Sequence, residues 1–191
     1  IPGPYILIGH SIGGLHVRSF TNKFPEDILG LFLIDPSHED IPEDSQKPTL
    51  FQSLFYYTMT DLYWTGIPFY GISERLDPTY RNSKNIRTYG NEYKGIALSI
   101  KEFKTNPYDI SKFPIYIISA QSDTENIELF YRKLFEKVID HSEHPIKKLI
   151  EYKLPHNIHL SDSDIVIKDL KLFLNELSNY KASESVNIIK N

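Results

Sequence analysis

The feature that most constrains this chain is a short apolar run that ends at a glycine and leads into helix-type sequence. The run from Tyr5 to Ile8 has the composition of a buried strand, and Gly9 follows it. From Ile12 to Phe24 the apolar residues recur on roughly one helical face, and Leu29 to Ile34 is a second apolar run that Asp35-Pro36 ends. Strand, turn, helix and strand within about thirty residues have the size of a βαβ unit. The sequence therefore predicts an α/β fold with a mostly parallel sheet.

The remainder of the chain first loses strand patterns and then regains them. No strong strand pattern lies between Ile41 and Lys112, where apolar residues keep helical spacing. Strand-type sequence returns at Ile115–Ala120 and Lys147–Leu154, with a predicted helix over Glu125–Ile139 between them and a final helix that begins near Ser161. The predicted organisation is core over 1–40, a helical cap insertion over 41–112, core over 113–180 and a polar tail over 181–191.

Composition excludes several classes of function. The net charge is −4 and no basic block is present, so nucleic acid is not an expected partner. The longest apolar stretch, 28–34, is far shorter than the roughly 20 residues of a membrane helix, so no membrane span is expected. The chain has no cysteine, which excludes disulfides, thiolate catalysis and cysteine-bound zinc. No sequence feature specifies a compartment, and the cytoplasm is the default expectation.

The turn Gly9-His10-Ser11-Ile12-Gly13 has the pattern G-x-S-x-G between a strand and a helix. A serine on such a sharp turn projects its hydroxyl from the backbone and can act as a nucleophile. The glycines two residues to either side are expected to remove β-carbons that would clash. The backbone N–H of Ile12, at a helix N-terminus, is positioned to stabilise an oxyanion. We predict Ser11 as the nucleophile and Ile12 as a backbone oxyanion donor.

A serine nucleophile needs a base, and His156 is the first histidine after the last predicted strand. Loops at the carboxyl ends of parallel strands are where ligand chemistry gathers in open α/β sheets. We predict His156 as the base and keep His159 as the alternative. His10 adjoins the nucleophile on the turn, and a packing role is expected for it. The pair His156 and His159 lacks the nearby carboxylate or third imidazole of a helical metal motif, so no metal and no cofactor are predicted.

The base needs a carboxylate that orients its imidazole. Asp123 follows the predicted strand 115–120 by three residues, and Asp35 follows the strand 29–34 directly. Both satisfy the chain order serine, acid, histidine. We favour Asp123 and keep Asp35 as the alternative, with Glu125 as a more remote candidate. An ordinary turn residue before Pro36 is the competing interpretation of Asp35.

At these residues the sequence resembles the α/β-hydrolase superfamily, in its esterase and lipase branch with a helical cap. The resemblance is carried by three segments of this chain: Pro4–Leu15 around the serine, Phe32–Asp40, and His156–Leu160, where His156 matches the catalytic position. The chain departs from the family pattern at Pro155 and Ala120, where the family usually has glycine. In this family several strands and helices precede the serine, and one of their loops supplies the second oxyanion amide.

The resemblance therefore implies that the chain is the C-terminal portion of an enzyme and that the second oxyanion donor lies elsewhere. It also implies a serine hydrolase acting on a carboxylic ester or related acyl compound through an acyl-serine intermediate. Other acyl chemistry (an amide, a lactone or acyl transfer) and a non-catalytic protein that only binds a ligand or partner are the alternatives. An apolar small-molecule acyl substrate would suit the aromatic residues of the predicted cap, which are Phe51, Phe55, Tyr56, Tyr57, Tyr63, Trp64, Phe69 and Tyr70.

Overall fold

A computed structural model describes residues 2–41, 83–105, 108–121 and 124–189. The chain divides into two compact units, one formed by Ile1–Asp40 with Phe103–Asn191 and the other by Ile41–Glu102. The helix α4 (Ser83–Thr105) supplies nearly all described residues of the second unit. Most of the predicted cap, including its aromatic residues, lies outside the described residues and stays a prediction. All four strands of the described sheet belong to the first unit.

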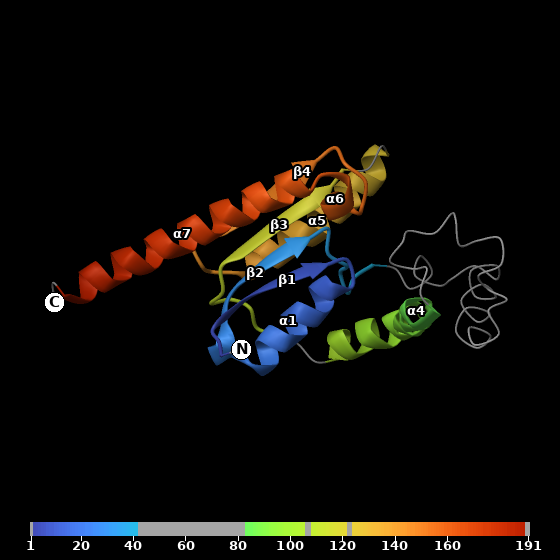
Figure 1. The fold of residues 1–191 in the computed structure, drawn as a ribbon, viewed down its shortest axis with the longest axis horizontal. Helices are drawn as coiled ribbons and strands as arrows, with labels where there is room; N and C mark the ends of the chain where they lie inside the picture. The colour runs from blue at the N-terminus through green and yellow to red at the C-terminus, as the bar shows by residue number, and fades with distance from the viewer. Residues whose placement is uncertain (1, 42–82, 106–107, 122–123, 190–191) are drawn as a thin grey trace. The chain divides into compact units, whose positions relative to one another are not determined.

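The first unit is built on four strands that all pair in parallel, which confirms the predicted α/β class and parallel sheet (Figure 1). In sheet order they are β1 (Tyr5–His10), β2 (Ile28–Ile34), β3 (Ile115–Ala120) and β4 (Lys147–Tyr152). Because every pair of neighbouring strands is parallel, the carboxyl ends of all four strands share one end of the sheet. Residues placed after these strands therefore meet there.

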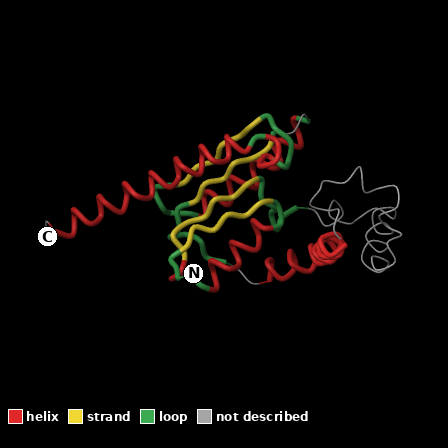
Figure 2. The backbone as a smooth tube through the Cα atoms, viewed as in Figure 1, coloured by secondary structure: helices red, strands yellow, loops and turns green. Residues whose placement is uncertain are grey.

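Helices alternate with the strands along the chain (Figure 2). They are α1 (Gly13–Lys23), the short 3₁₀ turn η1 (Pro25–Asp27), α5 (Glu125–His141), α6 (Ile158–Ser161) and α7 (Ser163–Ile189). Asp162 caps α7 by accepting the backbone N–H of Ile165 at 3.1 Å. The segment 181–191, expected to be a polar tail, continues this helix to Ile189.

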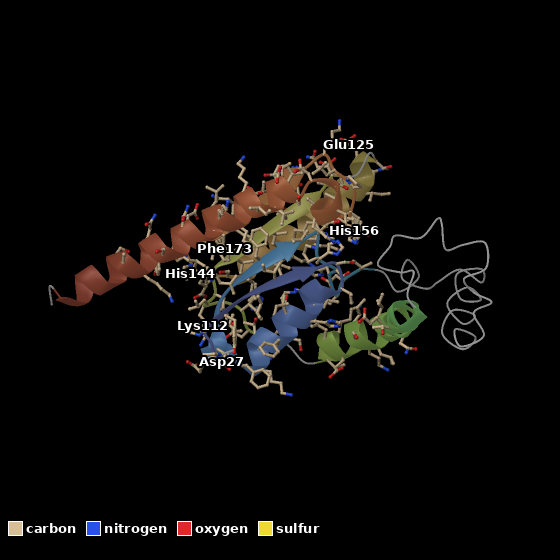
Figure 3. The ribbon with its side chains drawn as sticks, in the orientation of Figure 1. Asp27, Lys112, Glu125, His144, His156 and Phe173 are labelled. Atoms are coloured by element: carbon tan, nitrogen blue, oxygen red, sulfur yellow. The ribbon has the colours of Figure 1, made fainter. Side chains whose placement is uncertain are left out.

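The strands bury both faces of the sheet, because side chains alternate between them. Leu31 and Leu33 of β2 face a core that includes Phe135 and Val138 of α5. Phe32 and Ile34 face the opposite core, which α6 and α7 close with residues such as Phe173. Figure 3 shows Phe173 on α7 where that helix runs along the sheet. The apolar runs in the sequence are continuous because neither face of β2 meets solvent.

Strand β1 is one of the two edge strands of this sheet. It pairs with β2 on one side, and no described strand pairs with its other side. Ile8 on this strand keeps 50% of its surface exposed. An exposed apolar edge strand is a template for pairing with another chain. We therefore expect the 191-residue chain to self-associate.

The substitution Ile8→Lys should reduce that self-association, because a charge on an edge strand opposes strand pairing. It should leave the thermal midpoint nearly unchanged, since Ile8 is half exposed. Ile6→Lys is the matched control, because Ile6 packs against the α7-side core and its replacement should lower the midpoint. Sedimentation velocity measures association. A monodisperse wild-type monomer with a sharp thermal transition would contradict the expectation.

Candidate active site

Ser11 occupies the turn between β1 and α1, and its backbone has a conformation that residues with a side chain rarely adopt. Its φ is 53°, in the left-handed region, and only Asp35 shares a positive φ among described non-glycine residues. Three hydrogen bonds hold this turn. The N–H of Ser11 donates to the carbonyl of Ile34 at 3.1 Å, and the carbonyl of Ser11 accepts from the N–H of Gly14 at 2.9 Å and of Ser37 at 2.8 Å. The strained turn is thus fixed by the last residue of β2, by Ser37 just beyond that strand and by the start of α1.

The glycine requirement of this turn differs from the expectation at one position. A Cβ on Gly9 would lie 2.6 Å from the carbonyl oxygen of Gly13, so the strand and helix approach too closely for a side chain there, as predicted. A Cβ on Gly13 would meet nothing within 4 Å, so the steric role assigned to Gly13 was wrong. The second tight position is Gly14, where a Cβ would lie 2.4 Å from Cβ of Pro36. The G-x-S-x-G pattern does not predict that Gly14 must lack a side chain, because the residue that excludes one, Pro36, is distant in sequence.

Alanine substitutions at the three glycines should separate these roles. Gly9→Ala and Gly14→Ala should each destabilise the fold by about 2–3 kcal/mol, because backbone or ring atoms must move. Gly13→Ala should change stability by less than about 1 kcal/mol, since it has room and removes glycine entropy from the unfolded chain. Urea unfolding of the three variants measures these differences. Equal losses at Gly13 and Gly14 would contradict the assignment.

The backbone N–H of Ile12 is available at the N-terminus of α1. Ile12 is the N-cap residue of α1, and in the described part of the chain its N–H donates no hydrogen bond. Its carbonyl, by contrast, accepts from Leu15 and His16. An unpaired amide at a helix N-terminus favours negative charge nearby. This is the environment that an oxyanion donor requires.

Asp35 lies at the end of β2 and is held as rigidly as Ser11. Its φ is 39°, and its N–H donates to the carbonyl of Ile118 at 2.7 Å. Oδ1 accepts the N–H of Ala120 at 3.0 Å, which leaves Oδ2 for another partner. The side chain is 14% exposed. A carboxylate with one oxygen tied to the backbone can present the other in a fixed direction.

That partner is His156. Nδ1 of His156 lies 2.5 Å from Oδ2 of Asp35, across 121 positions of sequence. The carboxylate can only accept in this contact, so Nδ1 carries the proton and Nε2 is left as the base. The imidazole is 53% exposed, and Figure 3 shows His156 at the end of the sheet toward which the strand arrows point. Asp27, Lys112 and His144, which precede strands, lie at the opposite end.

The other predicted site residues are distributed as follows. Asp123 lies outside the described residues, so its role stays a prediction. Glu125 begins α5 and makes no described contact with His156. His159 lies in α6, where its Nδ1 is buried without a hydrogen-bond partner among the described residues. No hydrogen bond joins Ser11 Oγ to His156 in the described part of the chain; such bonds often tighten only when substrate is bound.

His10 contributes more than the packing expected for it. Its Nε2 lies 3.1 Å from the backbone carbonyl oxygen of His156. Its ring lies 4.7 Å from the His156 ring and 4.5 Å from the His159 ring, centroid to centroid. Burial lowers the pKa of His10 below its ordinary value, so the ring is neutral at neutral pH. The position of His10 next to Ser11 was the one sequence signal for a role in the site. No sequence pattern predicts that its side chain would contact the backbone of His156.

A buried charge cluster packs against the turn at Ser11, and the sequence analysis did not predict it. Arg18 of α1 is fully buried, and its guanidinium donates to Glu39 Oε2 at 2.8 Å and to the Tyr108 hydroxyl at 2.6 Å. It also donates to the carbonyls of Gly14 and Ser37, both at 3.3 Å. Burial raises the pKa of Tyr108 to about 12, so the hydroxyl keeps its proton and donates to Glu39 Oε1 at 3.1 Å.

His38 lies beside this cluster and is 3% exposed. Its Nδ1 accepts the backbone N–H of Asp40 at 3.0 Å, which a protonated Nδ1 could not do. Burial lowers the pKa of His38 from 6.5 to about 4, and Glu39 opposes this only in part. The folded protein therefore holds a buried, neutral imidazole at neutral pH.

This histidine should make the fold sensitive to mild acid. Between pH 6.5 and about 4 the unfolded chain binds a proton at His38 and the folded chain does not, so stability falls as pH decreases through that window. The full loss from this group is about 3 kcal/mol. His38→Asn keeps an acceptor near the Asp40 N–H and should flatten the decline by that amount. Urea unfolding at several pH values measures both slopes, and parallel slopes would refute the assignment.

Comparisons with known proteins identify the fold. A probable hydrolytic enzyme of Pseudomonas aeruginosa aligns with a TM-score of 0.52 and 16% identity over 91% of this chain and 64% of that one. A carboxylesterase of the thaumarchaeon Nitrososphaera gargenis aligns at 0.55 and 15%, over 93% and 67%. A thermophilic esterase from Thermogutta terrifontis aligns at 0.53 and 16%, over 92% and 66%. The chain has part of an α/β-hydrolase fold.

The α/β-hydrolase fold is covered only in part, since the chain spans about two thirds of the length of these structures. No protein-family model matches the chain, and no curated protein is similar to it in sequence. Among the described residues, no three histidine or acidic side chains are arranged to hold a metal ion. None of the described helices has the length and hydrophobicity of a membrane span.

Proposed function

We propose that this chain carries the nucleophile, base and carboxylate of a serine hydrolase that acts on a carboxylic ester or related acyl compound. The observation that supports it most directly is the contact of the His156 Nδ1 with Asp35, at the same sheet edge as the left-handed Ser11. Three polar groups with complementary roles thus follow β1, β2 and β4 at one edge. The same fold hosts many activities, so these side chains, and not the fold, support the proposed reaction.

In the proposed reaction, Nε2 of His156 removes the hydroxyl proton of Ser11 while Oγ attacks the acyl carbon. The carbonyl oxygen becomes an oxyanion, which accepts the N–H of Ile12. The tetrahedral intermediate collapses to an acyl-serine, and the imidazolium returns its proton to the departing alcohol. Water then repeats the sequence and releases the acid. Asp35 holds the imidazole with Nδ1 protonated throughout and stabilises the cation that forms.

We assign the orienting carboxylate to Asp35 in this proposal, and Asp123 is the competing candidate. The distance of 2.5 Å between Asp35 Oδ2 and His156 Nδ1 favours Asp35, as does the tie of its other oxygen to Ala120. Asp123 is supported by chain order alone, since it follows β3. A second oxyanion donor is still required, and we expect it outside the described residues.

The substrate class is proposed from the predicted cap. Its aromatic residues would suit an apolar acyl or alcohol group, and an apolar small molecule is the expected ligand. Hydrolysis of an amide or a lactone, and acyl transfer to an acceptor other than water, would pass through the same acyl-serine. A panel of substrates distinguishes these reactions from ester hydrolysis. The alternative from another class is a non-catalytic protein. It is favoured by the fact that the described residues supply one oxyanion donor, the N–H of Ile12, where the reaction needs two. It would bind acyl compounds without turnover.

Labelling by a fluorophosphonate tests the nucleophile. The probe should modify Ser11 in the protein, and Ser11→Ala should abolish the modification, because the probe reports an activated serine. Peptide mass spectrometry identifies the modified residue. Absence of labelling, or labelling that survives Ser11→Ala, would refute the proposal.

The rate of the same labelling separates the two carboxylates. Asp35→Asn should slow labelling by roughly 10³–10⁴-fold, since the imidazole loses its orienting acceptor and its favoured tautomer. Asp123→Asn is the matched control and should change the rate by less than about threefold. The reverse result would transfer the role to Asp123 and leave the serine mechanism intact.

A further inference from the structure

His10 connects the nucleophile turn to the loop that carries the base. The loop after β4 reaches His156 four residues beyond Tyr152, and the imidazole is half exposed. In the described part of the chain, the carbonyl of His156 accepts a hydrogen bond only from Nε2 of His10, at 3.1 Å. The backbone at His156 is therefore held by the residue that directly precedes Ser11.

The direction of this hydrogen bond fixes the tautomer of His10. A carbonyl oxygen carries no proton, so Nε2 must donate. Because His10 is neutral at neutral pH, its Nδ1 then carries no proton. A neutral donor adds no charge beside the imidazolium that forms on His156 during the proposed reaction. A lysine or arginine in this place would supply the same donor but oppose that cation.

Two anchors thus act on His156 from two different strands. Asp35, after β2, holds the ring through Nδ1 at 2.5 Å, and His10, at the end of β1, holds the backbone carbonyl. The carboxylate fixes one point of the ring, and the hydrogen bond from His10 adds a second fixed point on the backbone of the same residue. The two contacts together restrict the position of Nε2 relative to Ser11, and small displacements of a base are costly in rate.

We propose that His10 is a positioning residue, which holds the His156 loop against the nucleophile turn by donating Nε2–H to the His156 carbonyl. The inference rests on the proposed serine hydrolase and assigns His10 no contact with substrate. It gives the residue a role through its hydrogen bond rather than through its ring contacts with His156 and His159.

Two substitutions separate the hydrogen bond from the ring contacts. His10→Phe keeps an aromatic ring and removes the donor, whereas His10→Gln places an amide N–H near the position of Nε2 and removes the ring. We expect His10→Phe to slow fluorophosphonate labelling of Ser11 and kcat for p-nitrophenyl butyrate by roughly tenfold, with KM nearly unchanged. His10→Gln should retain rates within about threefold of wild type. Comparable thermal midpoints establish that both variants fold.

The tautomer of His10 provides a test on the wild-type protein that does not depend on variants. In ¹⁵N NMR spectra at neutral pH, Nε2 of His10 should be protonated and Nδ1 should not. A His10 that carries its proton on Nδ1 would overturn the inference, as would a His10→Phe variant with wild-type rates or slower labelling of His10→Gln than of His10→Phe. Failure of the wild type to label at Ser11 would instead refute the proposed function and the positioning role together.

Discussion

The site depends on the hydrogen bonds that join the turn at Ser11 to the end of β2 and to the residues just beyond that strand. The Ser11 N–H reaches Ile34, its carbonyl reaches Ser37, and Gly14 packs directly on Pro36. A left-handed backbone at a residue with a side chain persists only where its surroundings over-determine it. Here the surroundings are the end of β2, a buried strand whose apolar residues lie in both cores. The conformation of the nucleophile is therefore a consequence of the sheet order β1-β2-β3-β4.

The Arg18 cluster extends the same constraint into the helix behind the turn. A buried guanidinium is costly unless nearly all of its donors are satisfied, and here Glu39, Tyr108 and two backbone carbonyls accept from it. The carbonyl partners belong to Gly14 and Ser37, which also hold the Ser11 turn. Burial raises the pKa of Glu39, but the charge and hydrogen bond of Arg18 act in the opposite direction, and the net shift of that pKa is downward. The Arg18–Glu39 pair thus ties α1 to the segment that follows Asp35.

Local pattern was sufficient to predict most of the sheet and the serine turn. The runs at 28–34 and 115–120 became β2 and β3 because both faces of those strands are buried, which removes alternation and leaves an unbroken apolar signal. The roles of Gly13 and Gly14 could not be distinguished in this way. Their difference depends on the packing of Pro36, which is a tertiary contact. The buried Arg18 was missed for the same reason, since a charged residue on a helix face is ordinarily solvated.

The choice between the two aspartates shows where sequence order stops being informative. Strands in a sheet lie about 4.8 Å apart, so a loop after β4 must cross the end of β3 to reach a residue after β2. The chain does this within a few residues, because His156 follows Tyr152 by four positions and its ring still contacts Asp35. The Ala120 N–H at the end of β3 points to Asp35 Oδ1, so the end of β3 supports that carboxylate. Chain order allows an acid after either β2 or β3. The loop after β4 crosses toward β2 and brings the imidazole of His156 to Asp35. The contact of His10 with the His156 carbonyl lies at the far end of this loop.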